Sequence, residues 1–273
     1  MFCYRLHRLG IKKIRVICEN LWLKILLQEI YYPETMRRGV ENGFLLQGTI
    51  APMNLLHLDD HIIVLNKPAG LPVLPDGWDA TRDTPYLVKM LEAEYGKIFI
   101  VHRLDKATSG VMVFARTAEA HRDLSIQFEK HTVNKIYHAL VEGNPKWDKH
   151  TAHHPLRANV GHKHRTVVDD RGGKPSVTHF RVLRRFASAC LLEAIPETGR
   201  THQVRVHAAA LGYPLIADTS YGSRVSEGMD RPALHAQSLT FQHPASHENV
   251  TFTAPYPDDF ASALTRLTES LNR

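Results

Sequence analysis

A single carboxylate, Asp105, lies between two cations, Arg103 and Lys106, in the segment HRLDKATSG at residues 102–110. A carboxylate that neighbouring positive charges hold in its ionised form can act as a nucleophile or as a general base. The polar segment ends on a glycine and precedes the apolar run VMVFA, which indicates a loop that leads into a strand. The same letters also describe an ordinary charged surface turn, so the rest of the chain has to decide between the two interpretations.

Three further motifs accompany HRLDKATSG, namely NKPAGLPV at 66–73, NKIYHALVEG at 134–143 and TGRTHQVRVHAAALGYPLIAD at 198–218. A closing segment, RPALHAQSLTFQHPASHENVTFTAP, follows them. In this order the motifs resemble the RluA-type pseudouridine synthases, and the resemblance runs from about Leu55 to Pro257. A short motif matches by chance, whereas four ordered motifs rarely do. The sequence is therefore interpreted as a member of this family, in its short form without an S4 domain.

The resemblance implies an RNA pseudouridine synthase, an isomerase that converts specific uridines of rRNA or tRNA into pseudouridine. The bond from ribose C1′ to N1 breaks, the uracil turns, and C5 bonds to C1′. No group is oxidised, donated or lost, so we expect neither a cofactor nor a metal, and the chain has no GxGxxG, GxxxxGK[ST] or HExxH motif. The expected partner is structured RNA, with the target uridine in a hairpin loop, because a duplex hides its base edges.

Three residues carry the chemistry that the resemblance implies: Asp105, Tyr137 and Arg205. Asp105 attacks the sugar or the base, or removes a ribose proton, and the sequence leaves these versions open because all of them need the same carboxylate. Tyr137 stacks on the target base and relays a proton. Arg205 pairs with Asp105 and holds it ionised and correctly aimed.

Four further residues are expected to contact RNA: His102, Arg103, Arg200 and His202. Arg103 is placed to fill the space that a flipped-out uridine leaves in its stack and to reach a phosphate. The other three could contact the RNA backbone or position the loop, and a structural role is equally open for each. The basic, turn-rich segment 157–175 could supply further RNA contacts, with a solvated loop as the alternative.

Local patterns predict the elements that position these residues. The alternation in KIYHALVEG predicts a strand that puts Tyr137 on the core or cleft face. In the motif at 198–218, Thr201 is expected to cap a helix that ends at Gly212 and buries Val204 and its neighbours at helical spacing. Arg205 lies beside that apolar stripe, from where it can turn inward toward a buried anion.

The remaining predicted elements are helices at 84–96 and 117–131, the second capped by Thr117, and strands at 61–68, 111–115, 175–186 and 189–199. This order of elements favours an α+β domain on a largely antiparallel sheet. The resemblance implies the same class: the pseudouridine synthase fold, a curved, antiparallel or mixed sheet flanked by helices with a central catalytic cleft.

Composition restricts the function less than the motifs do. The 273 residues are 43% hydrophobic and 23% charged, as in an ordinary globular protein, with a formal net charge of +6. Residues 1–52 carry most of that excess, so charge alone favours an RNA partner only weakly, through local clusters such as 157–165 and 181–185. Three widely spaced cysteines favour a reducing, cytoplasmic location. No apolar run is long enough to predict a membrane-spanning helix, and we expect a monomer.

Residues 1–52 precede the first motif, and we expect them to be an N-terminal extension before a catalytic domain at 53–273. Two interpretations of the extension stay open: a poorly ordered segment, or an upstream start codon with Met36 or Met53 as the true start. Its early basic residues also resemble an organelle-targeting helix.

Two other functions compete with the synthase. A metal-dependent hydrolase is suggested by eighteen histidines and by the cluster His150, His153 and His154, although the spacing matches no zinc motif. An inactive RNA-binding protein of the same fold is the second alternative, and the intact Asp105 and Tyr137 argue against it.

Overall fold

The computed structural model describes residues 54–75, 85–161 and 165–271, so the predictions for residues 1–52 lie outside the described part. Within these ranges ten strands form one sheet: β1 (Asn54–Leu58), β2 (Ile62–Lys67), β3 (Phe99–Ile100), β4 (Ser109–Ala115), β5 (Asn134–Glu142), β6 (Lys149–Ala152), β9 (Thr178–Arg185), β10 (Ala189–Pro196), β11 (Leu234–Gln242) and β12 (Asn249–Thr253). The strand order is β1-β2-β4-β11-β5-β10-β9-β6, with β12 on β11 and β3 on β4. β7 (Leu156–Val160) and β8 (Arg165–Val168) form a separate hairpin.

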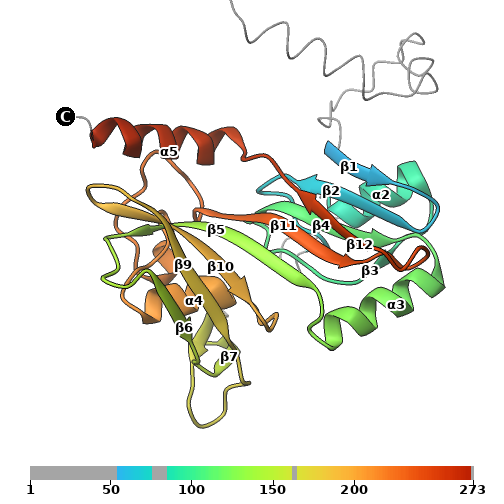
Figure 1. The fold of residues 1–273 in the computed structure, drawn as a ribbon, viewed down its shortest axis with the longest axis horizontal. Helices are drawn as coiled ribbons and strands as arrows, with labels where there is room; N and C mark the ends of the chain where they lie inside the picture. The colour runs from blue at the N-terminus through green and yellow to red at the C-terminus, as the bar shows by residue number, and fades with distance from the viewer. Residues whose placement is uncertain (1–53, 76–84, 162–164, 272–273) are drawn as a thin grey trace, which may run out of the picture. The chain divides into compact units, whose positions relative to one another are not determined.

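Four helices and one 3-10 turn accompany the sheet in the described residues: α2 (Leu87–Tyr95), α3 (Ala118–Glu129), α4 (Gln203–Ala210), α5 (Asp258–Ser270) and η3 (Thr219–Tyr221) (Figure 1). All strand pairs are antiparallel except β4 with β11, so the sheet is mixed and largely antiparallel. The predicted α+β fold is confirmed. None of the described helices is long and apolar enough to cross a membrane.

The half of the sheet that contains β2 and β4 is covered on both faces. Ile62 and Val64 of β2 pack with the α3 residue Leu124, whereas Ile63 and Leu65 pack with residues of α2. Because successive side chains of a strand point to opposite faces, a continuous apolar run is what a strand between two helices requires.

The other half of the sheet follows the same principle. Ala139 and Val141 of β5 pack with α4, while Leu140 between them packs with α5. Tyr137 is partly buried against both the cluster that includes α2 and the cluster that includes α4. The predicted face of Tyr137 is therefore confirmed, and this side chain lies where the two clusters meet.

The central strands bring the HRLD loop close to Tyr137. Ala236 of β11 is paired with Gly110 of β4 on one side and with Tyr137 of β5 on the other. Gly110 has a φ of 116°, and a Cβ atom there would collide with the backbone of Ala236. Only glycine fits this close approach, which explains why the motif HRLDKATSG ends as it does.

The helix boundaries test the predicted caps. Thr117 caps α3 as expected, because its hydroxyl accepts the backbone N–H of Ala120 at 3.1 Å. The predicted cap at Thr201 is wrong, since α4 begins after His202, a residue with a left-handed backbone and no capping hydrogen bond from its side chain. The side chain of Gln203 instead accepts the N–H of Arg200 at 3.0 Å, so an amide inside the helix closes its start.

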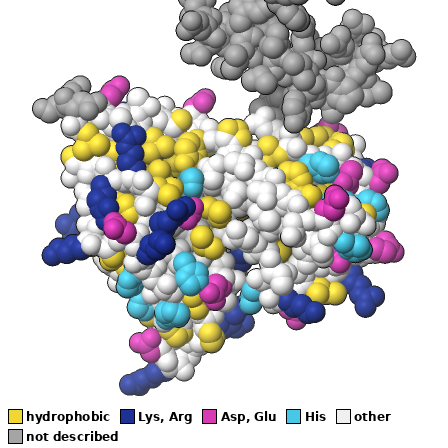
Figure 2. All heavy atoms as spheres, viewed as in Figure 1, with side chains coloured by type: hydrophobic (Ala, Val, Ile, Leu, Met, Phe, Trp, Pro, Cys, Tyr) yellow, Lys and Arg dark blue, Asp and Glu magenta, His cyan; other side chains and the backbone are white. Residues whose placement is uncertain are grey.

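The basic cluster predicted at 181–185 lies on β9, away from the residues that line the main cleft. Arg181 pairs with Glu193 and Arg185 with Asp148. Figure 2 shows basic side chains on this side of the molecule interspersed with acidic ones. These arginines are partly neutralised, which weakens the expectation that this cluster docks RNA.

Candidate active site

A cleft of about 750 Å³ opens beside a smaller pocket of about 90 Å³, and the two share one wall. The residues that line both spaces come from the HRLD loop, from β5 and from the segment before α4: Arg103, Leu104, Asp105, Lys135, Tyr137, Gly199, Arg200 and His202. The predicted residue His102 lines the larger space. The fold therefore gathers residues from three motifs that are far apart in the chain.

Asp105 is partly exposed in this cleft, with 29% of its side chain accessible. Its Oδ2 atom lies 3.6 Å from Nη1 of Arg205 and 3.8 Å from Nε2 of His202. Both separations exceed hydrogen-bond length, so the carboxylate faces two nitrogen groups without being bound tightly by either. Within the described residues the cations near Asp105 are not its sequence neighbours, because Arg103 and Lys106 are exposed and form no ion pair with it.

Arg205 is buried, which is the inward orientation that the helix pattern left open, and it faces two aspartates. Its Nε and Nη2 atoms donate to the two carboxylate oxygens of Asp218 at 2.7 and 2.9 Å. Asp218 is 1% exposed, so this is a fully buried bidentate pair. The expected partner Asp105 is thus the looser of the two, and the tight partner was missed although Asp218 is the last residue of the quoted motif at 198–218.

The elements around Arg205 explain its aim. The chain before Asp218 runs beside β5, where Glu142 N–H donates to Pro214 and Ile216 N–H donates to the carbonyl of Leu140. The guanidinium also lies 5.0 Å from the ring centre of Tyr221. The position of Arg205 is therefore determined from several sides before any substrate arrives.

His202 links Tyr221 to Asp105. It has a φ of 54°, which is uncommon for a residue other than glycine, and its Nδ1 lies 2.8 Å from the Tyr221 hydroxyl. Burial lowers the pKa of His202; the negative charge of Asp105 opposes this shift, and the guanidinium of Arg205 adds to it. A neutral His202 that accepts the tyrosine hydroxyl proton at Nδ1 carries its own proton on Nε2, the atom that faces Asp105.

Tyr137 presents an aromatic ring and a protonated hydroxyl to the same space. Burial, with the negative charge of Asp105 as the second cause, raises the pKa of Tyr137 well above its ordinary value. The phenol is therefore neutral at physiological pH and able to donate a hydrogen bond. A relay role then requires Tyr137 to release one proton as it receives another.

Lys67, in the motif NKPAGLPV, contacts the backbone of the HRLD loop through its ammonium group. This lysine is fully buried, and its Nζ atom donates to the carbonyls of Pro68, Leu71 and Lys106 at 2.7, 2.9 and 3.2 Å. Burial, together with the positive charge of Arg231, lowers the pKa of Lys67 to about 7, and the nearby Asp105 opposes that effect. Three carbonyl acceptors match the three N–H bonds of an ammonium group, which favours the charged form. The sequence reading gave Lys67 no role.

The other residues predicted to contact RNA differ in whether their side chains are already bound within the protein. His102 accepts the N–H of Val113 at Nε2 and stacks on Phe128, and burial lowers its pKa to about 3, so this ring supports the loop as a neutral side chain. Arg103 is exposed at the mouth of the cleft. The Nε atom of Arg200 is buried without a hydrogen-bond partner among the described residues.

Lys135 is a cleft residue that the sequence reading did not single out. It lies two positions before Tyr137 on β5, and its Nζ atom donates to the carbonyl of Glu197 at 3.5 Å. Burial lowers the pKa of Lys135. The spacing from Tyr137 could have identified it, because residues two apart on a strand share a face.

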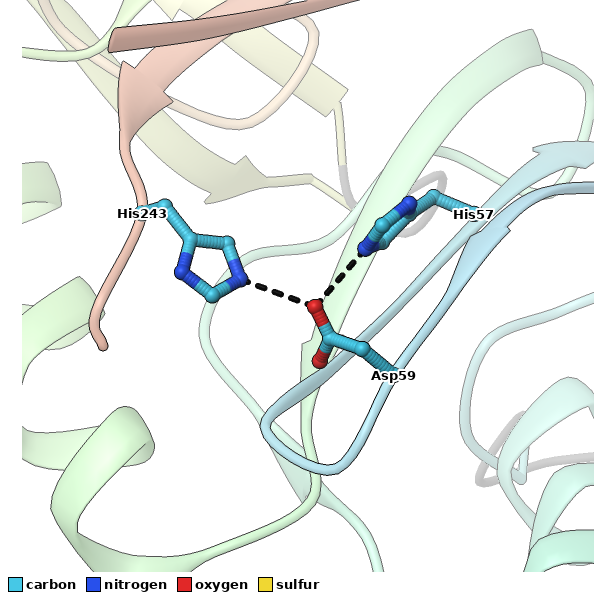
Figure 3. Close-up of side chains that lie close together, drawn as sticks. All are labelled: His57, Asp59 and His243. Atoms are coloured by element: carbon cyan, nitrogen blue, oxygen red, sulfur yellow. Dashed lines mark hydrogen bonds and ion pairs between the residues drawn. The ribbon is translucent and has the colours of Figure 1, made fainter. Parts of the chain in front are cut away.

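One group of side chains in the described residues has metal-ligand spacing, and it lies outside the cleft: His57, Asp59 and His243 (Figure 3). The Nδ1 atom of His243 accepts two backbone N–H groups at 3.3 Å, so its proton is on Nε2, which donates to Asp59 at 2.9 Å. That nitrogen is a donor here, which favours a structural role at the β1–β2 turn over metal binding. The histidines that suggested the alternative of a metal-dependent hydrolase, His150, His153 and His154, do not form such a group.

Comparison with known proteins agrees with this geometry. A family model described as RNA pseudouridylate synthase matches residues 61–210. A protein of Zymomonas mobilis named ribosomal large subunit pseudouridine synthase D is 38% identical over 225 residues, which cover 76% of this chain and 70% of that protein. The protein of the same name from Nitrosomonas europaea is 38% identical over 251 residues, with 87% and 72% covered.

Two solved human structures are also similar. RNA pseudouridylate synthase domain containing 4 aligns with a TM-score of 0.65 and 26% identity, over 79% of this chain and 93% of that one. RNA pseudouridylate synthase domain containing 1 aligns with the same score and identity, over 84% and 98%.

Proposed function

The chain belongs to the RNA pseudouridylate synthase family, as its motifs predicted, and we propose that Asp105, Tyr137 and Arg205 form the reactive centre of this RNA pseudouridine synthase. One observation supports the assignment most strongly. The carboxylate of Asp105 is open to the cleft and accepts no hydrogen bond from the described residues, while a buried guanidinium lies 3.6 Å behind it. Such a carboxylate keeps its lone pairs for a substrate and is stabilised as an anion.

Each residue then has a defined task. Asp105 attacks the nucleoside or removes a ribose proton, and the ring of Tyr137 stacks on the uracil while its hydroxyl passes a proton on. Arg205 is held by Asp218, so it offers Asp105 charge without covering its oxygens. The N1–C1′ bond breaks and the C5–C1′ bond forms, and the proton that leaves C5 is the one that must be relayed.

For the substrate we propose a uridine in a loop of large-subunit ribosomal RNA, flipped out of its stack into the cleft. The names of the two bacterial relatives support the choice of RNA. Lys135 and Arg200 line the cleft, lie partly buried and form no ion pair with a carboxylate among the described residues, which suits them to phosphate. Arg103 is proposed to fill the vacated stack.

The segment 157–175 supports a longer RNA path. A groove of about 410 Å³ between this segment and the residues before α4 is lined by Arg157, Lys174 and Arg200. Arg157 is paired with Asp169 at 2.7 Å, whereas Lys174 and Arg200 form no ion pair with a carboxylate among the described residues. Because Arg200 also lines the main cleft, an RNA backbone can follow Lys174 and Arg200 toward Asp105. We further propose that the catalytic domain is 53–273 and acts as a cytoplasmic monomer.

The decisive experiment replaces Asp105 by asparagine. Asp105→Asn is expected to abolish pseudouridine formation while RNA affinity and melting temperature stay near those of the parent. Asp60→Asn is a matched control, because Asp60 is an exposed aspartate outside the cleft. Full activity in Asp105→Asn would refute the assigned chemistry, and it would favour another carboxylate.

The substrate needs a separate measurement. Pseudouridine mapping across total RNA, with and without this gene, is expected to reveal one or a few lost sites in large-subunit rRNA. Loss confined to tRNA would contradict the proposed substrate but not the reaction.

Stoichiometric zinc in the purified protein would revive the hydrolase interpretation, and binding of RNA without any lost site would favour the inactive binding protein.

A further inference from the structure

Arg231, at the start of the closing segment, lies beneath the loop that carries Asp105. Its Nη1 atom donates to the carbonyl of Ala107 at 3.0 Å, two residues after Asp105. The same nitrogen contacts the carbonyls of Leu234 and Pro232 at 3.2 and 3.4 Å. Nε and Nη2 donate to the two oxygens of Asp259 at 2.6 and 2.9 Å. Nη2 also contacts the hydroxyl of Ser109, so every N–H bond of this guanidinium is in use, and the Arg231 side chain is only 12% exposed.

The hydrogen bonds around Ala107 transmit its position to Asp105. The N–H of Thr108 donates to the carbonyl of Asp105 at 3.0 Å, which closes a turn over residues 105–108. The carbonyl of Lys106 accepts the N–H of Gly70 at 2.8 Å as well as the ammonium of Lys67. A displacement of Ala107 has to move this turn, and the carboxylate moves with it.

Arg231 also begins a chain of hydrogen bonds that runs through Ser109 and His235. Nη2 of Arg231 donates to the hydroxyl of Ser109 at 3.3 Å, and that hydroxyl lies 2.9 Å from Nδ1 of His235. The other ring nitrogen of His235 faces the carbonyl of Ala254 at 3.2 Å, so it carries the proton and Nδ1 is the acceptor. The chain of donors thus runs in one direction from Arg231 to Ala254 and locks the start of β4 against β11.

Asp259, the carboxylate that pairs with Arg231, belongs to the C-terminal helix α5. Asp259 lies in the first turn of α5, and its Oδ1 atom also accepts the N–H of Phe260 at 2.7 Å. Phe260 is fully buried in a cluster with Leu140 of β5. The carboxylate that orients Arg231 is therefore anchored to the sheet by the packing of α5.

We propose that Arg231 and Asp259 are positioning residues that determine where Asp105 stands in the cleft, so that α5 takes part in catalysis without touching RNA. Neither residue lines the cleft. The inference depends on the role proposed for Asp105. It predicts that the pair affects the chemical step and leaves RNA binding unchanged.

The test compares Asp259→Asn, Asp259→Ala and Arg231→Lys in the full chain, by single-turnover rate at saturating RNA, RNA Kd and melting temperature. We expect the rate to fall about 10- to 100-fold in Asp259→Ala, because a misplacement of about 1 Å can cost about 100-fold. Asp259→Asn and Arg231→Lys, which keep part of the contact, should lie between it and the parent. RNA Kd should stay within about twofold in all three.

Arg266→Ala is the matched control on the same helix, since Arg266 of α5 bonds the carbonyl of Glu227 and contacts no loop residue near Asp105. A structural role alone would lower the melting temperature in both sets and leave the rate at low temperature unchanged. If Asp259→Ala fails to fold, Asp259→Asn and Arg231→Lys test the same link, because each keeps part of the contact between Arg231 and Asp259. Parental rates in the Arg231 and Asp259 variants, beside an inactive Asp105→Asn, would overturn this inference alone. An active Asp105→Asn would overturn the proposed function.

Discussion

Replacing Asp218 by asparagine tests the buried pair that holds Arg205. The substitution keeps the size of the side chain and one acceptor oxygen, but it removes the charge that receives two hydrogen bonds of 2.7 and 2.9 Å. Breaking a buried ion pair costs about 3–5 kcal/mol of unfolding free energy. In this variant Arg205 keeps one hydrogen-bond acceptor at position 218 and still has the anion of Asp105 at 3.6 Å. We therefore expect the unfolding free energy to fall by about 2–3 kcal/mol. For a domain of this size that corresponds to a melting temperature about 5–10 °C lower.

Activity should fall for a related reason. Without its tight partner, Arg205 is free to turn onto Asp105 and donate hydrogen bonds to it, which occupies oxygens that the substrate needs. A shift of about 1 Å in the carboxylate is enough for a loss of about 100-fold, so we expect the single-turnover rate of Asp218→Asn to fall about 10- to 100-fold. Urea unfolding and pseudouridine formation on the mapped RNA measure the two effects separately.

A double-mutant cycle distinguishes a device for aiming Asp105 from a simple source of stability. Arg205→Met combined with Asp218→Leu removes both buried charges, and we expect it to recover most of the unfolding free energy lost in either single variant but none of the activity. Asp148→Asn is the control, because Asp148 pairs with Arg185 but is 85% exposed, so its loss should change neither quantity much. A parental rate in Asp218→Asn, or a double variant that regains activity, would refute the reasoning.

Three further results are expected. Tyr137→Phe keeps the ring but should slow the reaction about 100-fold or more at unchanged RNA Kd, and a parental rate would limit Tyr137 to packing. Lys135→Gln should weaken RNA binding and reduce the slope of log K against log salt concentration by about one, whereas an unchanged slope would exclude a phosphate contact. Burial lowers the pKa of His235 to about 4 and that of His102 to about 3, so below the ordinary value of 6.5 the unfolded chain binds protons that the native state excludes. The unfolding free energy should therefore decrease as pH falls from about 6.5 toward 4, less steeply in His235→Gln, and a flat profile in urea titrations would contradict this.

The fold was predictable where local signals and burial agree. The runs HIIVLNKP and VMVFA have enough apolar residues for two covered faces, and Thr117 has the hydroxyl that its cap needs. The start of α4 was not predictable from the sequence. Thr201 has a hydroxyl that could cap a helix, but the helix begins after His202, which has a left-handed backbone, and the side chain of Gln203 accepts the N–H of Arg200. That choice depends on tertiary hydrogen bonds, which propensity does not include.

The site shows a similar division. Asp105, Tyr137 and Arg205 came from motifs, and the structure places them around one cleft and its rear wall. The partners that hold them, Asp218 and Lys67, also lie within quoted motifs, but no spacing rule connects them to the residues they serve. Asp218 reaches Arg205 through a turn beside β5, and Lys67 reaches the HRLD loop through backbone carbonyls that every residue has. Contacts of this kind follow from the three-dimensional fold alone.

The two aspartates around Arg205 interact with its guanidinium in different ways, because one is buried and the other is partly exposed. Asp218 is 1% exposed and accepts two hydrogen bonds from Arg205, so we expect it to stay paired when RNA binds. Asp105 is 29% exposed, lies just beyond hydrogen-bond length from the same guanidinium, and stays accessible to a ligand in the cleft. Electrostatic attraction decreases slowly with distance while hydrogen bonding ends abruptly, so Arg205 at 3.6 Å can stabilise the anion without engaging its lone pairs. We infer that the buried second aspartate keeps the arginine at that distance, so Asp218 contributes to the proposed chemistry by positioning the charge that faces Asp105.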